Sequence, residues 1–153
     1  MINSMPQKSF TLIELLTVMV VIGILVLVGM PALRNFQPTL KLNGIVRSLM
    51  SDLRLTQQLA ISEQLEYCLV LPEPFPSDRN YQIIQCDQAE VFKQVFIPEE
   101  ITGLSIIPSL SNSEVRYNPY GSVKESAQII LENINNKTKT IDVRPSGFIR
   151  ISD

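Results

Sequence analysis

Leu15–Met30 reads LLTVMVVIGILVLVGM, a stretch without a charged side chain. Together with Phe10–Ile13 it makes an apolar run of 21 residues, which a single carboxylate, Glu14, interrupts. An α-helix needs roughly 20 residues to cross the hydrocarbon core of a bilayer. The run therefore predicts a membrane-spanning helix and places Glu14 where an ionised side chain is costly and, by default, functional. The alternative is that Glu14 simply lies in the headgroup layer.

The remainder of the chain has an ordinary composition. Of its 153 residues, 45% are hydrophobic and 18% are charged, so one domain with a packed core can follow the apolar run. The segment before the run is polar and carries Lys8, and positively charged flanks stay in the cytoplasm. We therefore expect a single-pass protein of the inner (cytoplasmic) membrane, with its larger part outside the cytoplasm.

The composition argues against most enzyme classes. The chain has no histidine, which removes the commonest general base and the commonest metal ligand. Its two cysteines are too few for a four-thiolate zinc site or an iron–sulfur cluster. A formal net charge of −2 excludes a protein that coats nucleic acid over its whole surface. We expect a protein that is not an enzyme and has no catalytic residue, metal or cofactor.

A secretory signal peptide is the first alternative for the apolar run. Such a signal has an apolar region of about 7–15 residues, and a cleavage site with small residues follows it. Here the run is longer, and Met30–Asn35 reads MPALRN without an A-x-A-like site. We therefore expect the run to remain in the mature protein.

Lys8–Leu16 reads KSFTLIELL and resembles the processing motif of type IV prepilins and type II secretion pseudopilins. The resemblance implies a leader peptide of residues 1–9, which a prepilin peptidase cleaves between Ser9 and Phe10 before it methylates the new amino terminus on Phe10. It also implies that Glu14 pairs with the amino terminus of a neighbouring subunit in a filament. A buried acid in an apolar bundle needs such a cationic partner. Ser9 stands where the family usually has Gly, which implies less efficient cleavage.

The helix is expected to continue beyond the membrane. Pro31 lies where the pilin family often has a kink, near the outer end of the apolar segment. Pro38 is a second expected kink, because proline removes a backbone donor and clashes with the preceding turn. The predicted division is a transmembrane or filament-core helix over residues 10–33 and a head over residues 34–153.

Residues 39–64 carry apolar side chains at helical spacing. The stripe consists of Leu42, Ile45, Leu49, Leu53, Leu59 and Ala60. The charged residues Lys41, Arg47, Asp52 and Arg54 are distributed around it. The stripe predicts a helix face that packs against a sheet, and a groove for a partner is the alternative.

After Leu65 the sequence changes to short β-branched and aromatic runs that proline and Ser/Asp/Asn clusters separate. The predicted strands are Glu66–Leu71, Asn80–Cys86, Val91–Pro98, Leu104–Ile107, Val115–Asn118, Ala127–Asn133, Thr138–Arg144 and Phe148–Ser152. One long helix followed by short antiparallel strands predicts a pilin-like α+β fold, with the helix packed on an antiparallel sheet.

Three segments of the head resemble the GspH/FimT group of minor pseudopilins and its competence counterpart, ComGD. Leu53–Ser62 is similar to their helix with an Ala-Ile element before the first strand. Val115–Gly121 resembles their strand that ends in an Asn-x-x-Gly turn, and Pro145–Ile151 resembles their terminal Gly-x-x-Arg strand. The likeness covers the head only in patches.

Two cysteines, Cys68 and Cys86, lie in the first two predicted strands. If these strands form a hairpin in which Cys68 opposes Cys86, the Cα atoms come roughly 4.5 Å apart, at the short end of disulfide geometry. A head outside the cytoplasm favours oxidation. The alternative is two small buried hydrophobic side chains. A catalytic cysteine is not expected, because there is no histidine to activate it.

Charge is segregated along the head. Glu63–Glu114 contains nine acidic residues and two basic ones, whereas Val115–Ile151 contains six basic and three acidic ones. The candidate DNA contacts are Lys137, Lys139, Arg144 and Arg150, since basic side chains supply the salt-dependent part of DNA affinity. Some FimT-like proteins bind DNA through a Gly-Arg-x-Arg element, but here Gly147–Arg150 reads GFIR and lacks one arginine. The alternative is a solvated hairpin face.

The sequence as a whole predicts a minor pilin or pseudopilin, a structural subunit of a type II secretion pseudopilus or of a type IV pilus or competence filament. Its expected partners are a prepilin peptidase, the membrane and the other pilins of the filament. One alternative is a minor pilin that binds extracellular DNA through the basic hairpin. Another is an anchored single-pass domain that never enters a filament.

Overall fold

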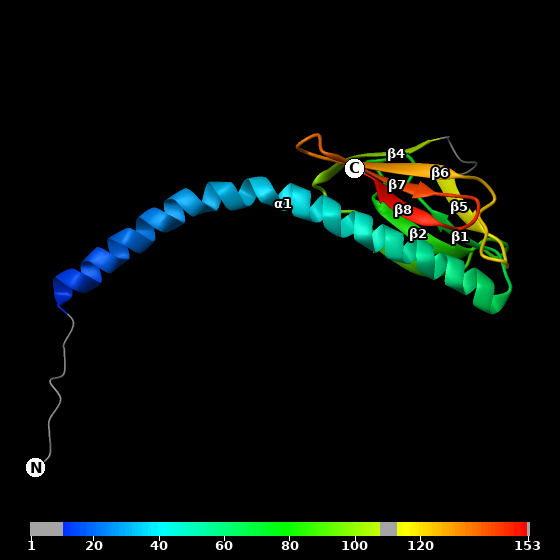
Figure 1. Ribbon diagram of the computed structural model, residues 1–153, viewed down its shortest axis with the longest axis horizontal. Coiled ribbons are helices and arrows are strands. Elements are labelled where there is room, and N and C mark those ends of the chain that lie inside the picture. Colours follow the sequence, from blue (N-terminus) through cyan, green and yellow to red (C-terminus); the bar gives the residue numbers. More distant parts are fainter. Residues whose placement is uncertain (1–10, 108–112, 153) are drawn as a thin grey trace, which may run out of the picture. The chain divides into compact units, whose positions relative to one another are not determined.

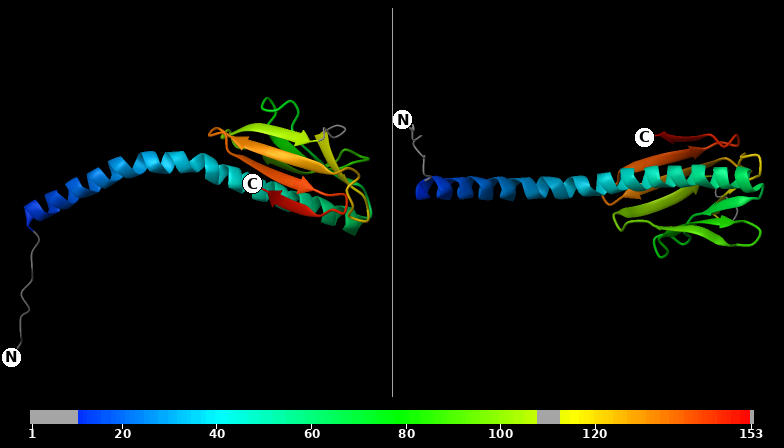
Figure 2. Two further views of the ribbon diagram at one scale, coloured as in Figure 1. Left: turned by 45° about the horizontal axis from the view of Figure 1, so that its top comes forward. Right: turned by 90° about the horizontal axis from the view of Figure 1, so that it is seen from below.

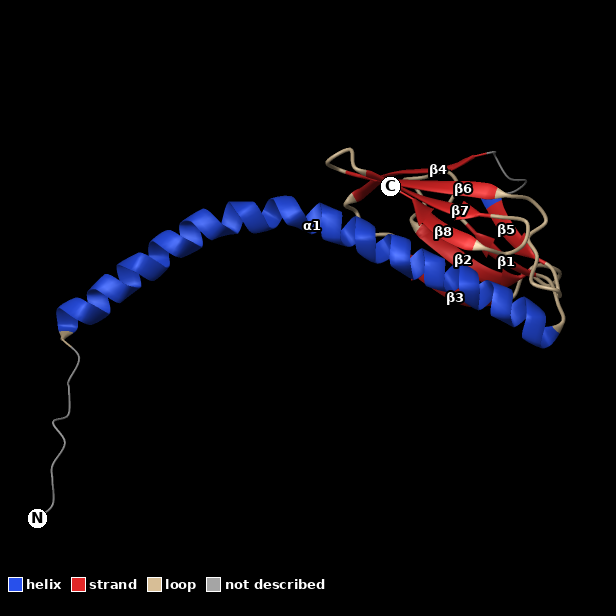
Figure 3. Ribbon diagram, in the orientation of Figure 1, coloured by secondary structure: helices blue, strands red, loops and turns tan. Residues whose placement is uncertain are grey.

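The computed structural model describes residues 11–107 and 113–152, apart from the side chains of 31–35. It opens with one helix, α1 (Leu12–Glu63), which continues without a break through Pro31 and Pro38 (Figures 1 and 3). The helix ends where Gln64 takes a left-handed conformation with φ of 57°, a common way for a helix to stop. The chain divides into two compact units, Met1–Phe36 and Gln37–Asp153, and we call the second unit the head.

In the described part of the head, eight strands form two antiparallel sheets of four strands each. The strands are β1 (Tyr67–Val70), β2 (Asn80–Gln85), β3 (Val91–Phe96), β4 (Ile101–Ile107), β5 (Glu114–Tyr117), β6 (Ala127–Asn133), β7 (Thr138–Val143) and β8 (Ile149–Ser152). The first sheet has the order β3-β2-β1-β5, and the second has the order β4-β6-β7-β8.

The α+β fold expected from the sequence is confirmed, and each predicted strand overlaps a strand of the structure. The sequence did not indicate that the strands divide between two sheets. The chain leaves the first sheet after β3, enters the second as β4 and returns to the first as β5. As a result β5 pairs with β1 and β4 pairs with β6. Such distant pairings depend on the packing of the whole head and leave no local pattern in the sequence.

One apolar core joins α1 to both sheets. The helix contributes Leu42, Ile45, Val46, Leu49, Leu53 and Ala60, all buried. The first sheet adds Leu69 and Ile83, and the second adds Ile129, Leu131 and Ile141. The predicted helical stripe is therefore the face that packs on the sheets.

One charged residue departs from the pattern expected around that stripe. Lys41, Arg47 and Arg54 are exposed, but Asp52 is only 3% exposed. Asp52 follows Leu49 by three residues and precedes Thr56 by four, so helical geometry turns it towards the sheets. The expectation that Asp52 lies outside the packing face is wrong. Its position in the helix directs it towards the sheets, and the hydrogen bonds from Tyr81 and Lys93 compensate for burying its charge.

Candidate functional site

The start of α1 has the geometry of a helix cap. The N–H of Glu14 donates to Oγ1 of Thr11 (3.3 Å) and to the carbonyl oxygen of Thr11 (3.1 Å). Thr11 is therefore the N-cap, and Glu14 is the third helical residue, as in the Thr-x-x-Glu pattern of a capping box. A carboxylate in the first turn also faces the positive end of the helix dipole. The Thr-x-x-Glu spacing was the available sequence signal for this cap.

The apolar segment Leu12–Met30 leaves its side chains uncovered. Its 19 residues form a helix that by length and composition is able to cross a membrane, and no part of it is buried in the protein. At 1.5 Å per residue the segment is about 28 Å long, close to the hydrocarbon thickness of a bilayer. Its only hydroxyl, on Thr17, donates to the carbonyl oxygen of Ile13 at 2.7 Å. The Thr17 hydroxyl is thus satisfied within the helix, as an apolar environment requires, and the carboxylate of Glu14 is the ionisable group that the segment exposes.

The predicted cleavage site, Ser9 and Phe10, lies outside the described residues, as does the leader before it. Pro31 and Pro38 both lie within α1, and neither ends it. The kinks expected at the two prolines remain predictions.

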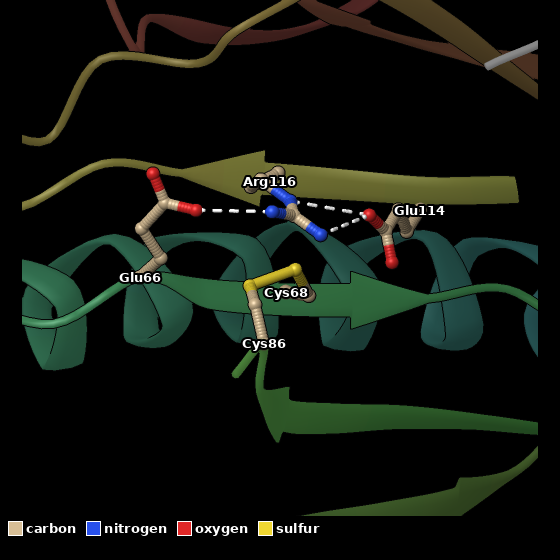
Figure 4. The surroundings of a disulfide bond; sticks show 5 residues. All are labelled: Glu66, Cys68, Cys86, Glu114 and Arg116. Atoms are coloured by element: carbon tan, nitrogen blue, oxygen red, sulfur yellow. Dashed lines mark hydrogen bonds and ion pairs between the residues drawn. A yellow bond between two sulfur atoms is a disulfide. The ribbon is translucent and has the colours of Figure 1, made fainter. Parts of the chain in front are cut away.

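Cys68 and Cys86 form a disulfide with their Cα atoms 5.4 Å apart (Figure 4). The register differs from the expected one, because Cys68 opposes Ile84 rather than Cys86. Cys86 lies just beyond β2, where its N–H donates to the carbonyl oxygen of Glu66 at 3.0 Å. This two-residue shift in register pairs Leu69 with Ile83, and both side chains are fully buried. Apolar packing therefore sets the register of the two strands, and the disulfide joins Cys68 diagonally to Cys86 across them.

A cation lies over the disulfide. Arg116 of β5 opposes Cys68 across the strand pair, so both side chains are on the same face of the sheet. Its guanidinium donates to Glu114 at 2.9 Å and to Glu66 at 3.1 Å, and Figure 4 shows it between the two carboxylates. The hydrogen bonds to Glu114 raise the pKa of Arg116, which outweighs the effect of burial. Cys68 itself is fully buried, which agrees with a structural rather than a reactive role.

Asp52 belongs to a polar cluster between α1 and the first sheet. Its carboxylate accepts hydrogen bonds from the Tyr81 hydroxyl at 2.7 Å and from Nζ of Lys93 at 2.6 Å. The Tyr81 hydroxyl also lies 3.3 Å from Oγ of Ser48. Burial is the main cause that raises the pKa of Tyr81, and its bond to Asp52 adds to it. This cluster was not expected from the sequence, although the helical spacing of Asp52 was a usable signal for it.

Two turns meet the end of α1 at Gln57. Gly121 and Gly147 both have positive φ, +80° and +78°. Nε2 of Gln57 donates to the carbonyl oxygen of Gly121 at 2.8 Å. A Cβ atom on Gly147 would come within 2.2 Å of that nitrogen and 2.3 Å of that oxygen. The glycines of the two quoted motifs, Asn-x-x-Gly and Gly-x-x-Arg, thus serve close packing on the helix.

The four basic residues proposed to contact DNA do not form a single patch. Lys137 precedes β7 and Arg144 follows it, so the six residues of β7 separate them by about 20 Å. Lys139 is half-buried on the face of β7 that also carries buried Ile141. Arg150 pairs across the strands with Asp142, an acid on the same face. The expected basic face is therefore divided, because strand alternation directs neighbouring residues to opposite faces.

Among the described residues, no group of three or more His, Cys, Asp and Glu side chains is arranged to hold a metal ion. A groove of about 630 Å³ lies between α1 and β3, and Leu40 and Phe96 are among its lining residues. The prominent features of the chain are thus an uncovered apolar helix, a disulfide-bonded head and an apolar groove.

The family model for the prokaryotic N-terminal methylation motif matches residues 4–30, which include the capped start of α1 and its apolar segment. The amino-terminal part of the chain therefore carries this methylation motif. No curated protein sequence matches it.

Two solved structures show that the pilin-like fold extends to the head. The type IV minor pilin FimU of Pseudomonas aeruginosa is similar with a TM-score of 0.63 at 9% identity, over 77% of this chain and 92% of that one. The minor pseudopilin EpsH from the type 2 secretion system of Vibrio cholerae is similar with a TM-score of 0.60 at 12% identity, over 73% of this chain and 96% of that one. At these identities the likeness shows a shared fold and nothing further.

Proposed function

We propose that this protein is a structural subunit, a minor pilin or pseudopilin, of a type II secretion pseudopilus or a type IV pilus or competence filament. One observation carries the proposal. A methylation motif at residues 4–30 leads directly into an apolar helix that the protein does not cover and that continues unbroken into the head. Such a segment needs an apolar environment, which the bilayer supplies before assembly and a bundle of neighbouring helices supplies in a filament.

The disulfide in the head supports the proposal that the head is exported from the cytoplasm. Disulfides persist in oxidising compartments and are rare in the cytoplasm. The bond between Cys68 and Cys86 therefore agrees with a head outside the cytoplasm, anchored by a single span in the inner membrane. We propose that the protein acts by assembling with other subunits rather than by catalysing a reaction.

In this proposal a prepilin peptidase removes residues 1–9 and methylates Phe10. Glu14 then pairs with the amino terminus of a neighbouring subunit, because an amine in an apolar helix bundle needs a counter-charge. Glu14 is exposed in the first turn of α1, so its carboxylate is free to face another subunit.

The intact mass of the membrane-extracted protein tests the proposal. The expected mature protein begins at Phe10 and carries one methyl group on its amino terminus. A mature protein that begins beyond Pro31 would identify an ordinary signal peptide and refute the assignment. An unprocessed chain that begins at Met1 would instead support the alternative of an anchored single-pass domain that never enters a filament.

Binding of extracellular DNA is the other function that the sequence suggested. It requires basic side chains that together follow a phosphate backbone. Because Lys137 and Arg144 lie at opposite ends of β7 and Arg150 lies beside Asp142, the described surface does not favour it. We therefore propose the structural role alone.

A further inference from the structure

The two cysteines of the disulfide differ in how accessible they are. Cys68 lies within β1 and is fully buried, whereas Cys86 is half-buried just beyond the end of β2. The rate of thiol–disulfide exchange depends on which sulfur an attacking thiolate can reach. The two ends of this bond are therefore not equivalent for exchange.

A side chain of β5 covers the Cys68 end of the bond. A thiolate attacks a disulfide sulfur from the side opposite the bond that breaks. For Cys68 that side is β5, because β1 lies between β2 and β5 in the sheet. Arg116 of β5 opposes Cys68 on the same face, and its hydrogen bonds to Glu66 and Glu114 hold the guanidinium there (Figure 4). The approach to Cys68 is thus obstructed in the folded head.

The Cys86 end has no comparable cover among the described residues. Strand β2 ends at Gln85, and the chain turns at once towards β3. The N–H of Gln85 donates to the carbonyl oxygen of Glu90 at 3.0 Å, which closes this turn beside Cys86. Residues 87–90 of the turn are all exposed. A thiolate that comes from the side of β3 therefore reaches Cys86 without displacing a packed side chain.

The surroundings of Cys86 are acidic. Its N–H donates to the carbonyl oxygen of Glu66 at 3.0 Å, and Asp87 follows it in the sequence. Tyr67 of β1 senses two more acids. Its hydrogen bond to Glu63 and its burial raise its pKa, and the charge of Glu90 adds to this effect.

The cations near the disulfide lie on its other side. Arg116 is shared between two carboxylates, and its carbonyl oxygen accepts from the N–H of Lys124, so both basic residues belong to the β5 side. Lys93 of β3 is engaged by the buried Asp52. The field at Cys86 is therefore expected to attract a cationic thiol and to repel an anionic one.

We propose that thiol–disulfide exchange enters this bond at Cys86 and that the attacking group is a cationic thiol. The thiolate forms a bond to Sγ of Cys86, the bond between Cys86 and Cys68 breaks, and Sγ of Cys68 leaves with the electron pair and takes a proton from water. Cys68 stays buried beside Arg116, so after losing that proton it expels the attacking thiol and closes the disulfide again. Cys86 is thus a reversible modification site. The proposal goes beyond the proposed function and does not depend on it.

Brief treatment of the full-length protein in detergent with cysteamine tests the site of attack. Samples are transferred to acidic urea with excess N-ethylmaleimide and then digested with trypsin, which separates the two cysteines by cleavage after Arg79. Cysteamine is expected on the Cys86 peptide and maleimide on the Cys68 peptide, in about tenfold excess over the reverse labelling. Equal labelling of the two peptides, or cysteamine mainly on Cys68, would overturn the proposal.

Three small thiols test the charge preference. Cysteamine, 2-mercaptoethanol and 2-mercaptoethanesulfonate are cationic, neutral and anionic. At low salt, and corrected for the thiolate fraction, the rate of opening is expected to fall in that order by about fivefold or more, and high salt should reduce the spread. Asp87→Asn with Glu90→Gln should reduce it as well. The matched control, Glu99→Gln with Glu100→Gln, makes the same change of charge after the other end of β3 and should not. Equal rates for the three thiols, or equal effects of the two double variants, would refute the preference.

Arg116→Gln tests the cover over Cys68. Its loss is expected to admit attack at Cys68 and so to lower the excess of labelling at Cys86, whereas a merely structural role would change the overall rate and leave the ratio unchanged. Arg144→Gln is the control, in the loop before β8, and β8 lies on the other side of α1 from the green strands of the first sheet (Figure 2, right). If the Tm shows that Arg116→Gln is unfolded, Arg116→Lys takes its place. An unchanged ratio in the folded variant would refute the covering role.

Discussion

Gln57 and Gly121 are 64 residues apart in the sequence, yet Nε2 of Gln57 donates a hydrogen bond of 2.8 Å to the carbonyl oxygen of Gly121. Gly147 packs against the same amide, so one side chain of α1 holds two turns of the sheets. The turn after β5 and the turn before β8 therefore depend on the same helix residue. This contact helps to fasten the two turns to the helix, together with the bond from Gln64 to the carbonyl oxygen of Pro119.

Gly147→Ala is the sharpest test of that fastening. Alanine is strained at a φ of +78°, and its Cβ would lie 2.2 Å from Nε2 of Gln57. We expect the free energy of unfolding to fall by about 2 kcal/mol or more. Thermal and urea unfolding of the full chain in detergent measure it. The control is Gly44→Ala, which has open space and is expected to gain up to about 1 kcal/mol. Equal effects of the two changes would contradict the packing role.

Two buried tyrosines predict opposite effects of the same change. The Tyr117 hydroxyl is buried without a hydrogen-bond partner among the described residues, whereas Tyr81 donates to Asp52. Tyr117→Phe removes an unsatisfied group and is expected to be neutral or to stabilise the head. Tyr81→Phe leaves a buried carboxylate with one partner fewer and is expected to cost about 1–3 kcal/mol. Urea unfolding of both variants decides, and a larger loss for Tyr117→Phe would refute the assignment.

Tyr67 makes stability depend on alkaline pH. Its hydroxyl donates to Glu63, which with burial raises the pKa of Tyr67 to about 12 from 10.0. Because the folded protein holds this proton more tightly, the stabilisation is fully present below pH 10 and is lost as the pH rises through 12. Burial raises the pKa values of Tyr81 and Tyr117 as well, so they act in the same direction. Tyr67→Phe is expected to reduce, but not to abolish, the fall in Tm between pH 9 and 11.5. If the slope of Tm against pH is unchanged in this variant, the hydrogen bond from Tyr67 to Glu63 does not contribute to it.

The disulfide is expected to contribute most of its stability through the unfolded chain. Cys68 and Cys86 are 18 residues apart, and closing a loop of this size adds about 3 kcal/mol in the chain-entropy model. Replacing both with alanine should lower the free energy of unfolding by that amount. Non-reducing peptide mapping of the exported protein should recover the two cysteine peptides joined. Free thiols in freshly prepared protein would contradict the exported, oxidised state.

Glu14→Ala separates assembly from folding. Glu14 lies in the first turn of α1, whereas the core of the head begins at Leu42. The variant should therefore leave the Tm of the head unchanged while incorporation into filaments falls, because the neighbouring amino terminus loses its counter-charge. Thr17→Ala is a control in the same segment, since that hydroxyl bonds only its own helix. Normal incorporation of Glu14→Ala would refute the pairing role.

Several parts of this protein followed from local sequence patterns. The uncharged run Leu15–Met30 predicts the uncovered part of α1, because length and hydropathy act without any tertiary partner. The helical stripe from Leu42 to Ala60 and the eight strands also follow from local periodicity. The Thr-x-x-Glu spacing at Thr11 and Glu14, which forms the helix cap, is equally local.

The tertiary structure decided which distant groups meet. Local alternation does not say that β5 joins β1, that the register pairs Leu69 with Ile83, or that Cys86 reaches Cys68 diagonally. The same limit applies to charge, since the partners that allow Asp52 to be buried, Tyr81 and Lys93, come from two strands, β2 and β3. A periodic pattern specifies the face on which a side chain lies. Its partner is specified by the cooperative packing of the whole head, where burying apolar surface outweighs the preferences of any single segment.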